Sequence, residues 1–445
     1  MQRLLSNPIV RRVAKNSAYL FSASGISVVL SFFQNLLATN LLGVTLLGTL
    51  GVIVKFTSVI NKLASFRMNE LVVKYVGQYQ EEGRLQHAAA VFKLACLLET
   101  GSSVVSYSLI GLLAVWGARI FAHDVSFAGL FALYGLIVLG NVIYESTSGL
   151  LQIFDRFRGF SGLQIAQSFL TLTLIPLGYF SSQPLLVVVL AYMAGKLLVG
   201  LGTAVLAFRE GTRRWGPGWT RAPLNLLKDQ RRELFRFAFS TNISATINLV
   251  NKDSEELWVG ALLGTLEVGY YKQALALANL VLIPVSPLPQ ATYPELAREV
   301  ARKAWENVRY VLKQGSRLAA IYTGAASLFL IALGRPLITW LYGEEFLPAY
   351  PALVVLLAGL LIANTFYWNR TALLSLNQPD YPTKVNLFAA VLKIVLTPLL
   401  VPIFGYVASA ALLSGYYFLS IGLNVRKTYQ VLGRNEHESA HQHAI

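Results

Sequence analysis

The segment Val52–Val76, VIVKFTSVINKLASFRMNELVVKYV, joins an apolar first half of membrane-spanning length to charged side chains. Its polar positions recur every three or four residues, at Gly51, Lys55, Ser58, Lys62, Ser65 and Asn69. On a helix this spacing places them in one narrow stripe among aliphatic residues. Ionisable groups at membrane depth are costly and normally face a bundle interior or a hydrated cavity. The stripe therefore predicts a membrane helix that presents cations to an anionic ligand.

Composition extends this prediction to the whole chain. Of its 445 residues, 55% are hydrophobic and only 13% are charged, with a mean hydropathy of +0.54. Apolar runs of spanning length recur from end to end, so we expect an all-α polytopic membrane protein. Twelve spans are predicted, at 17–37, 44–66, 91–117, 128–152, 161–180, 185–208, 237–262, 268–291, 317–341, 351–375, 385–403 and 405–425.

The net charge of +15 follows the predicted membrane topology. Most Lys and Arg residues lie at the N-terminus, in the even-to-odd connections and in the tail, whereas the odd-to-even connections hold only Arg119 and Arg335. This bias places both termini in the cytoplasm and argues against a nucleic-acid partner. The predicted outer connections are too short to hold a folded domain.

An internal repeat divides the chain into two halves. Leu41–Gly43 followed by Gly48 recurs as Leu262–Gly264 followed by Gly269. The expected organisation is given by four ranges: 1–208 as a six-helix lobe, 209–236 as a basic cytoplasmic linker, 237–425 as a second six-helix lobe, and 426–445 as a cytoplasmic tail. Halves with an even number of spans enter the membrane the same way up, which predicts a central V-shaped cavity between two lobes.

Two basic segments outside the spans allow more than one interpretation. The linker sequence LLKDQRRELFRF could lie on the membrane as an amphipathic helix, but we favour a tether. The tail from Gly433 contains three histidines that could bind a metal ion, but we favour a disordered tail.

Charged residues within apolar runs are the candidate site residues. Basic candidates for contacting an anionic substrate are Lys55, Lys62, Lys252, Arg370 and Lys393. Acidic candidates for coupling to an ion gradient are Glu99, Glu145 and Glu255. Several have simpler explanations: Lys252 can be neutralised by neighbouring acids, and Arg370 can anchor its helix at the interface. Lys196 and Lys272 are expected to extend toward an interface.

The chain lacks sequence motifs for bond-making chemistry. It has no Walker sequence, no His/Cys/Asp cluster with metal-ligand spacing, and no Gly-x-Ser-x-Gly motif. Its single cysteine, Cys96, excludes an internal disulfide. We therefore expect no enzyme activity, no metal and no cofactor.

Two long segments resemble a known family. LLATNLLGVTLLGTLGVIVKFTSVI and SEELWVGALLGTLEVGYYKQALALANLVLIPVSPLPQATYPELAR are similar to O-antigen-type polysaccharide-biosynthesis flippases of the multidrug/oligosaccharidyl-lipid/polysaccharide exporter superfamily. The resemblance implies alternating access without ATP hydrolysis, and movement of an undecaprenyl-pyrophosphate-linked oligosaccharide from the inner to the outer leaflet of the cytoplasmic membrane. Lys55 and Lys62 match basic positions on the second span of such flippases, which implies pyrophosphate binding.

The partners expected from this resemblance are the lipid-linked oligosaccharide, membrane lipids, a proton or sodium ion, and polysaccharide polymerase machinery. Two other functions stay open. A cation-coupled multidrug exporter would need an acidic cavity, whereas the second span here is basic. A membrane glycosyltransferase or polymerase would need catalytic acids on substantial outer loops, and the predicted loops are short.

Overall fold

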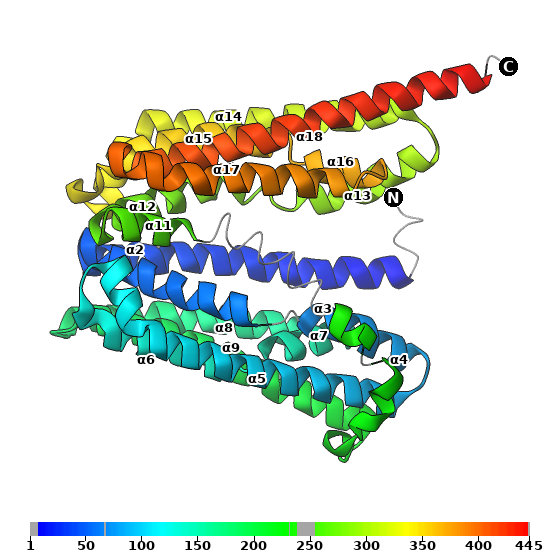
Figure 1. Ribbon diagram of the computed structural model, residues 1–445, viewed down its shortest axis with the longest axis horizontal. Helices are drawn as coiled ribbons and strands as arrows, with labels where there is room; N and C mark the ends of the chain where they lie inside the picture. Colours follow the sequence, from blue (N-terminus) through cyan, green and yellow to red (C-terminus); the bar gives the residue numbers. More distant parts are fainter. Residues whose placement is uncertain (1–7, 66–67, 231, 238–253, 444–445) are drawn as a thin grey trace. The chain divides into compact units, whose positions relative to one another are not determined.

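The computed structural model describes residues 8–65, 68–230, 232–237 and 254–443, and these residues form helices and turns with no strand among them (Figure 1). The chain divides into two compact units, Met1–Leu249 and Val250–Ile445. Candidate residue Lys252 and most of the predicted seventh span lie outside the described residues. The all-α membrane-protein class is confirmed.

The first unit contains the predicted spans 1–6. Its elements are α2 (Pro8–Ala64), α3 (Met68–Leu71), the π-helix η1 (Val72–Val76), α4 (Gly77–Glu81), α5 (Leu85–Gly117), the π-helix η2 (Ala118–Ala122), η3 (Val125–Phe127), α6 (Ala128–Gly140), α7 (Tyr144–Ile153), α8 (Phe157–Leu174), η4 (Ile175–Phe180), α9 (Pro184–Trp215), η5 (Trp219–Arg221) and η6 (Leu224–Gln230). Helix α2 packs against α5, α6, α8 and α9, so the charged second span belongs to the centre of this unit.

The second unit repeats this order of helices. Its elements are α11 (Glu255–Leu262), α12 (Thr265–Leu282), α13 (Leu288–Ala301), α14 (Trp305–Tyr342), η8 (Glu344–Phe346), α15 (Ala349–Thr365), α16 (Asn369–Ser375), α17 (Asp380–Phe404) and α18 (Tyr406–His443). Helix α15 packs against α12, α14 and α18.

Nine helical stretches in the described part of the chain are long and apolar enough to cross a membrane. The first, Gly25–Ala64, is kinked at Gly43. It includes the later part of the first predicted span and most of the second. Large apolar side chains point outward, with Leu112 77%, Trp340 81% and Phe180 90% exposed. Such helices are apolar on both their inner and outer faces, as expected for surroundings of lipid. The chain is therefore a multi-pass membrane protein, and the count of twelve spans stays a prediction.

The repeated Leu-Leu-Gly motif has a conformational cause. Gly43 has φ 64° and ψ −178°, and Gly264 has φ 128° and ψ 179°. This combination of positive φ and extended ψ is essentially restricted to glycine, because a Cβ atom would clash with the backbone. Each glycine lies between two successive helices, α11 and α12 in the second unit and the two halves of α2 in the first. The repeat thus marks the same sharp turn in both units.

The predicted spans 128–152 and 351–375 lie within two of the stretches that are long and apolar enough to cross a membrane, and each stretch contains a break in its helix. Residues 141–143 separate α6 from α7, and residues 366–368 separate α15 from α16. At the first break the Asn141 amide donates to the Ile137 carbonyl oxygen at 2.9 Å. At the second, the Asn369 amide donates to the Phe366 carbonyl oxygen at 2.8 Å. In each case the same carbonyl oxygen also accepts from the backbone N–H of that asparagine, so the side chain adds a second hydrogen bond at the break.

The segment predicted to be a tether is docked on the first unit. Residues 209–215 complete α9, and Trp219, Leu227 and Leu234 are buried in the same apolar cluster as Phe92. Tyr75 donates a hydrogen bond to Glu233 at 2.8 Å. Burial and that carboxylate raise the pKa of Tyr75 to about 12, so its hydroxyl stays a donor at physiological pH. The segment is neither a free tether nor a separate surface helix.

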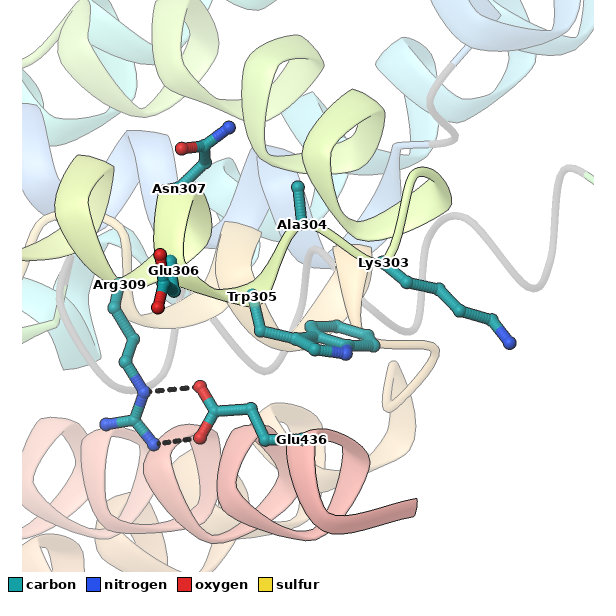
Figure 2. A pocket seen from close by; sticks show the side chains of 7 residues that line it. All are labelled: Lys303, Ala304, Trp305, Glu306, Asn307, Arg309 and Glu436. Atoms are coloured by element: carbon teal, nitrogen blue, oxygen red, sulfur yellow. Dashed lines mark hydrogen bonds and ion pairs between the residues drawn. The ribbon is translucent and has the colours of Figure 1, made fainter. Parts of the chain in front are cut away.

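The tail beyond Gly433 was expected to be disordered, but α18 continues as a helix to His443. Figure 2 shows Arg309 of α14 and Glu436 of α18 facing each other across a surface pocket. Two hydrogen bonds join them, from Nε to Oε1 at 2.5 Å and from Nη2 to Oε2 at 2.7 Å. This paired geometry is the most favourable one for an Arg–carboxylate contact, and it fixes the tail to the start of α14.

Candidate functional site

The first four residues of the charged stripe, from Gly51 to Lys62, lie on α2, whereas Ser65 follows the end of α2 and Asn69 lies in α3. Lys55 is half-buried, Lys62 is exposed near the end of the helix, and both have polar or charged neighbours. Arg67 lies outside the described residues, and Glu70 is exposed in α3. The half-buried ammonium group of Lys55 is the feature that most needs an explanation, because α2 is otherwise strongly apolar.

The neighbouring face of α2 lines a cavity inside the first unit, which we call the first-unit cavity. Its volume is about 300 Å³. Five helices contribute to its wall, with lining residues Val54, Thr57, Ser58, Asn61, Tyr134, Ile137, Val138, Asn141, Tyr144, Gln167, Lys196 and Val199. Of the predicted polar stripe, only Ser58 belongs to this wall, so the stripe and the cavity occupy adjacent faces of one helix.

Small residues allow α9 to approach the break in the fourth span closely. A Cβ atom added to Gly200 would lie 2.4 Å from the Gly140 carbonyl oxygen and 2.7 Å from Oδ1 of Asn141. Glycines at such positions let helix backbones pack more closely than any other residue permits. This contact brings Lys196, one turn earlier on α9, to the same cavity as Asn141.

Glu99 of α5 closes the break between α6 and α7 from another side. The Glu99 side chain is only 4% exposed. Its carboxylate accepts hydrogen bonds from the backbone N–H of Glu145 at 2.7 Å, from the backbone N–H of Ser146 at 2.9 Å, and from the Ser146 hydroxyl group at 2.7 Å. It thereby satisfies N–H groups that the start of α7 leaves without an intrahelical partner.

Two of the acidic candidates are thus connected through the backbone. The Glu145 side chain is half-buried in the first turn of α7, beside the N–H groups that Glu99 holds. A protonated carboxyl group loses part of its capacity to accept hydrogen bonds. A change of protonation at Glu99 would therefore act directly on the start of α7.

In the second unit, Glu255 and Lys393 form one buried group. Lys393 of α17 donates to Oε1 of Glu255 in α11, and Tyr271 of α12 donates to Oε2 of Glu255 at 2.5 Å. Glu255 is 5% exposed, Lys393 8% and Tyr271 0%. The sequence predicted Glu255 as an ion-coupling residue and Lys393 as a substrate contact. Their roles stay predictions, but the two side chains act on each other first.

Arg370 is exposed at the start of α16 and lines a second cavity of about 260 Å³. This cavity lies within the second unit and has polar lining residues Ser286, Asn364, Tyr367, Asn369, Asn386, Tyr417 and Ser420. The aromatic neighbour Trp368 is fully buried and donates from Nε1 to the Ser316 hydroxyl oxygen at 2.7 Å. Arg370 therefore lies at the wall of this cavity, and its role as a substrate contact or an interfacial anchor stays a prediction.

Sequence reasoning missed Thr57, Asn61 and Lys196 as residues of a common cavity. Thr57 and Asn61 are spaced four residues apart, which was the available signal that they share a face of α2. Lys196 lines the first-unit cavity with an exposed side chain, and its expected extension toward an interface stays a prediction. Within the described ranges, no three His, Cys, Asp or Glu side chains are grouped so that they could hold a metal ion.

Comparisons with known proteins give a consistent result. Residues 13–299 match the family described as polysaccharide biosynthesis protein. The chain is 25% identical over 346 residues to the inner membrane protein YghQ of Escherichia coli (strain K12), which covers 76% of this chain and 95% of that relative.

Two solved structures resemble the whole chain. A multidrug resistance MATE-family transporter of the MOP superfamily, in an inward-facing conformation, has a TM-score of 0.67 at 11% identity, over 92% of this chain and 95% of its own. The lipid II flippase MurJ in an inward closed conformation has a TM-score of 0.66 at 14% identity, over 94% and 90%. At such identities the likeness establishes the fold alone, which is that of membrane transporters and flippases.

Proposed function

Because the chain belongs to the polysaccharide biosynthesis protein family, we propose that it moves undecaprenyl-pyrophosphate-linked oligosaccharide units from the inner to the outer leaflet of the cytoplasmic membrane. The main observation in support is the half-buried Lys55 on the apolar helix α2, next to a face that lines a polar cavity. A cation held at membrane depth suits a substrate whose anionic head group must leave water.

In this mechanism Lys55 and Lys62 attract the pyrophosphate group, with Lys252 and Arg370 as further contacts. Lys393 contributes through its pair with Glu255. Polar side chains of the helices solvate the glycan, while the prenyl chain remains in lipid. Two lobes that rock around the substrate would give alternating access without covalent chemistry.

Coupling to a proton or sodium gradient is assigned to the buried acids. Glu99 holds the start of α7, and Glu255 holds α12 and α17. A change of charge at either site would loosen a contact between helices, which is how a bound ion can bias a conformational equilibrium. Glu145 lies in the first turn of α7, and its backbone N–H donates to Glu99, so a change of charge at Glu99 would also affect Glu145.

The proposed setting is the cytoplasmic membrane with both termini in the cytoplasm. There the delivered oligosaccharide would pass to polymerase machinery on the outer side. The segment 209–236 is rich in basic residues, which agrees with a cytoplasmic position under the positive-inside rule.

Leaflet transfer in liposomes tests the proposal. Purified protein should move a fluorescent lipid-linked oligosaccharide, and K55A and K62A should each slow this transfer at least tenfold, because each removes a charged contact to phosphate. K228A removes a lysine from the exposed surface of η6 and should transfer at the wild-type rate. Equal rates for all four proteins would contradict the assignment of the two lysines, and no transfer by the wild type would contradict the function.

A cation-coupled multidrug exporter is the second candidate, because a MATE transporter has the same fold. An exporter of organic cations needs accessible carboxylates. Glu99 and Glu255 are instead engaged by hydrogen-bond donors and a lysine. Expression that raised resistance to cationic dyes would favour this alternative.

A further inference from the structure

We propose that the first-unit cavity binds one sugar ring that carries a carboxylate, so that the substrate class is an acidic oligosaccharide. This inference rests on the proposed function, since it names the glycan of the same substrate. It is carried by three polar side chains of the cavity wall: the charged Lys196, and Thr57 and Asn61, whose Oγ1 and Oδ1 atoms are buried without a hydrogen-bond partner among the described residues.

The unsatisfied groups are unusual for the interior of a protein. Thr57 is 1% exposed, and its Oγ1 has no hydrogen-bond partner. Oδ1 of Asn61, one turn further along α2, is also buried without a partner. A buried polar atom that is left unpaired costs about 1–3 kcal/mol, so native structures rarely keep two in one cavity wall without a use. A ligand in the cavity is the nearest source of a partner once these side chains rotate toward it.

Lys196 supplies the charge. It lies on α9 twelve residues after the helix begins at Pro184, which places it well inside a membrane-spanning stretch. No hydrogen bond or ion pair joins its ammonium group to a described residue, in contrast to the ammonium group of Lys393 in the second unit. The Lys196 side chain is exposed, and an ammonium group at this depth needs water or an anion as its partner.

The combination of groups selects between possible anions. Lys196 needs an anionic oxygen, but Oδ1 of Asn61 is an acceptor and needs a donor. The ionised phosphates of a phosphodiester or of a lipid-linked pyrophosphate carry no hydroxyl group, so they offer no donor and would leave Asn61 unsatisfied. A sugar ring with a carboxylate offers both, because its hydroxyl groups donate as well as accept. The aromatic side chains of Tyr134 and Tyr144 add apolar wall to the same cavity.

The size of the cavity is consistent with a single ring. Its volume of about 300 Å³ lies at the lower end of the range for small-molecule sites. Since water occupies about 30 Å³ per molecule, the space corresponds to about ten water molecules, or one monosaccharide. The longer glycan would extend from this cavity.

Binding of soluble probes to the purified full-length protein tests the site. Saturation-transfer NMR and calorimetry with glucuronate, glucose and dimethyl phosphate, an anion without a hydroxyl group, should show binding of glucuronate only. K196M should weaken glucuronate at least tenfold, because a charge-assisted hydrogen bond is lost, while K196R should retain most of the affinity. N61L should also weaken it. K384M removes a lysine from the exposed start of α17 and should bind like the wild type.

Each other outcome would overturn the proposal. Unchanged affinity in K196M, equal binding of glucose, binding of dimethyl phosphate alone, or no binding of glucuronate by the wild type would each exclude an acidic-sugar site. The leaflet-transfer assay separates this result from the function itself. If the wild type transfers a lipid-linked oligosaccharide but does not bind glucuronate, the acidic-sugar site is contradicted and the proposed flippase function is not.

Discussion

A carboxylate closes the break between α6 and α7 in the first unit, whereas neutral side chains make the hydrogen bonds near the break between α15 and α16 in the second. Glu99 accepts from two backbone N–H groups and one hydroxyl group at the first break. At the second, the Asn364 amide lies 3.3 Å from the Thr323 hydroxyl oxygen and 3.4 Å from the Val281 carbonyl oxygen. The Asn424 amide donates to Oδ1 of Asn369 at 3.1 Å.

This difference separates two tasks that an interrupted membrane helix can perform. A break held by amides and hydroxyl groups satisfies the backbone at any physiological pH, because none of these groups titrates there. A break held by a carboxylate can respond to a proton or a cation. The second unit places its buried acid elsewhere, in the Glu255–Lys393 pair between α11 and α17. The repeat therefore preserves the geometry of the break and changes its chemistry.

The largest expected effect comes from the buried acid of the second unit. E255A leaves Lys393 buried without its carboxylate and should lower the free energy of unfolding by about 3–5 kcal/mol, the range for removing one member of a buried pair. Thermal unfolding of the protein in detergent measures this loss. The double variant E255L/K393L should recover most of it, and E344A, at an exposed acid of η8, should change little. A loss in E344A as large as in E255A would argue against a special role for the pair.

An intermediate effect is expected at the first break. E99Q keeps the size of the side chain but turns an NH₂ group toward N–H donors, so at least one donor of Glu145 or Ser146 loses its acceptor. Leaving a buried donor unpaired costs about 1–3 kcal/mol. Amide hydrogen exchange of Glu145 and Ser146 should become faster, which reports the start of α7 directly.

The control for E99Q is E81Q, at an exposed acid at the end of α4. It should leave unfolding and exchange unchanged. If exchange at the start of α7 were equally slow in E99Q, then Glu99 would not hold the break, and the contrast between the two units would lose its basis.

The sequence predicted the parts of this arrangement that depend on local pattern. Composition specified the membrane class, and the Leu-Leu-Gly repeat indicated two related halves. The structure adds that Gly43 and Gly264 of this repeat form sharp turns, because only glycine adopts their backbone conformation. The three-and-four spacing of polar residues also located the polar side of α2. Each of these signals can be recognised in the sequence without knowing how the helices pack.

The breaks and the buried pairs could not be predicted in the same way. Asn141 and Asn369 lie in apolar runs that are compatible with unbroken helices, and tertiary contacts decide that the helices end there. Glu99 and Glu145 are 46 positions apart, and Lys393 and Glu255 are 138 apart. Their contacts depend on how helices pack, so each residue alone looked like an isolated charge.

The smallest expected effect tests the neutral break. N364A removes the amide that links α15 to Thr323 of α14 and to the Val281 carbonyl oxygen of α12, and a neutral hydrogen bond contributes about 0.5–1.5 kcal/mol. Because no ionisable group is involved, the loss measured by thermal unfolding should be the same from pH 5 to pH 8, and the pH profile of leaflet transfer should match the wild type. E99Q should alter that profile, since it removes the ionisable group of the other break. A changed pH profile in N364A together with an unchanged one in E99Q would reverse the assignment and place the ion-sensitive break in the second unit.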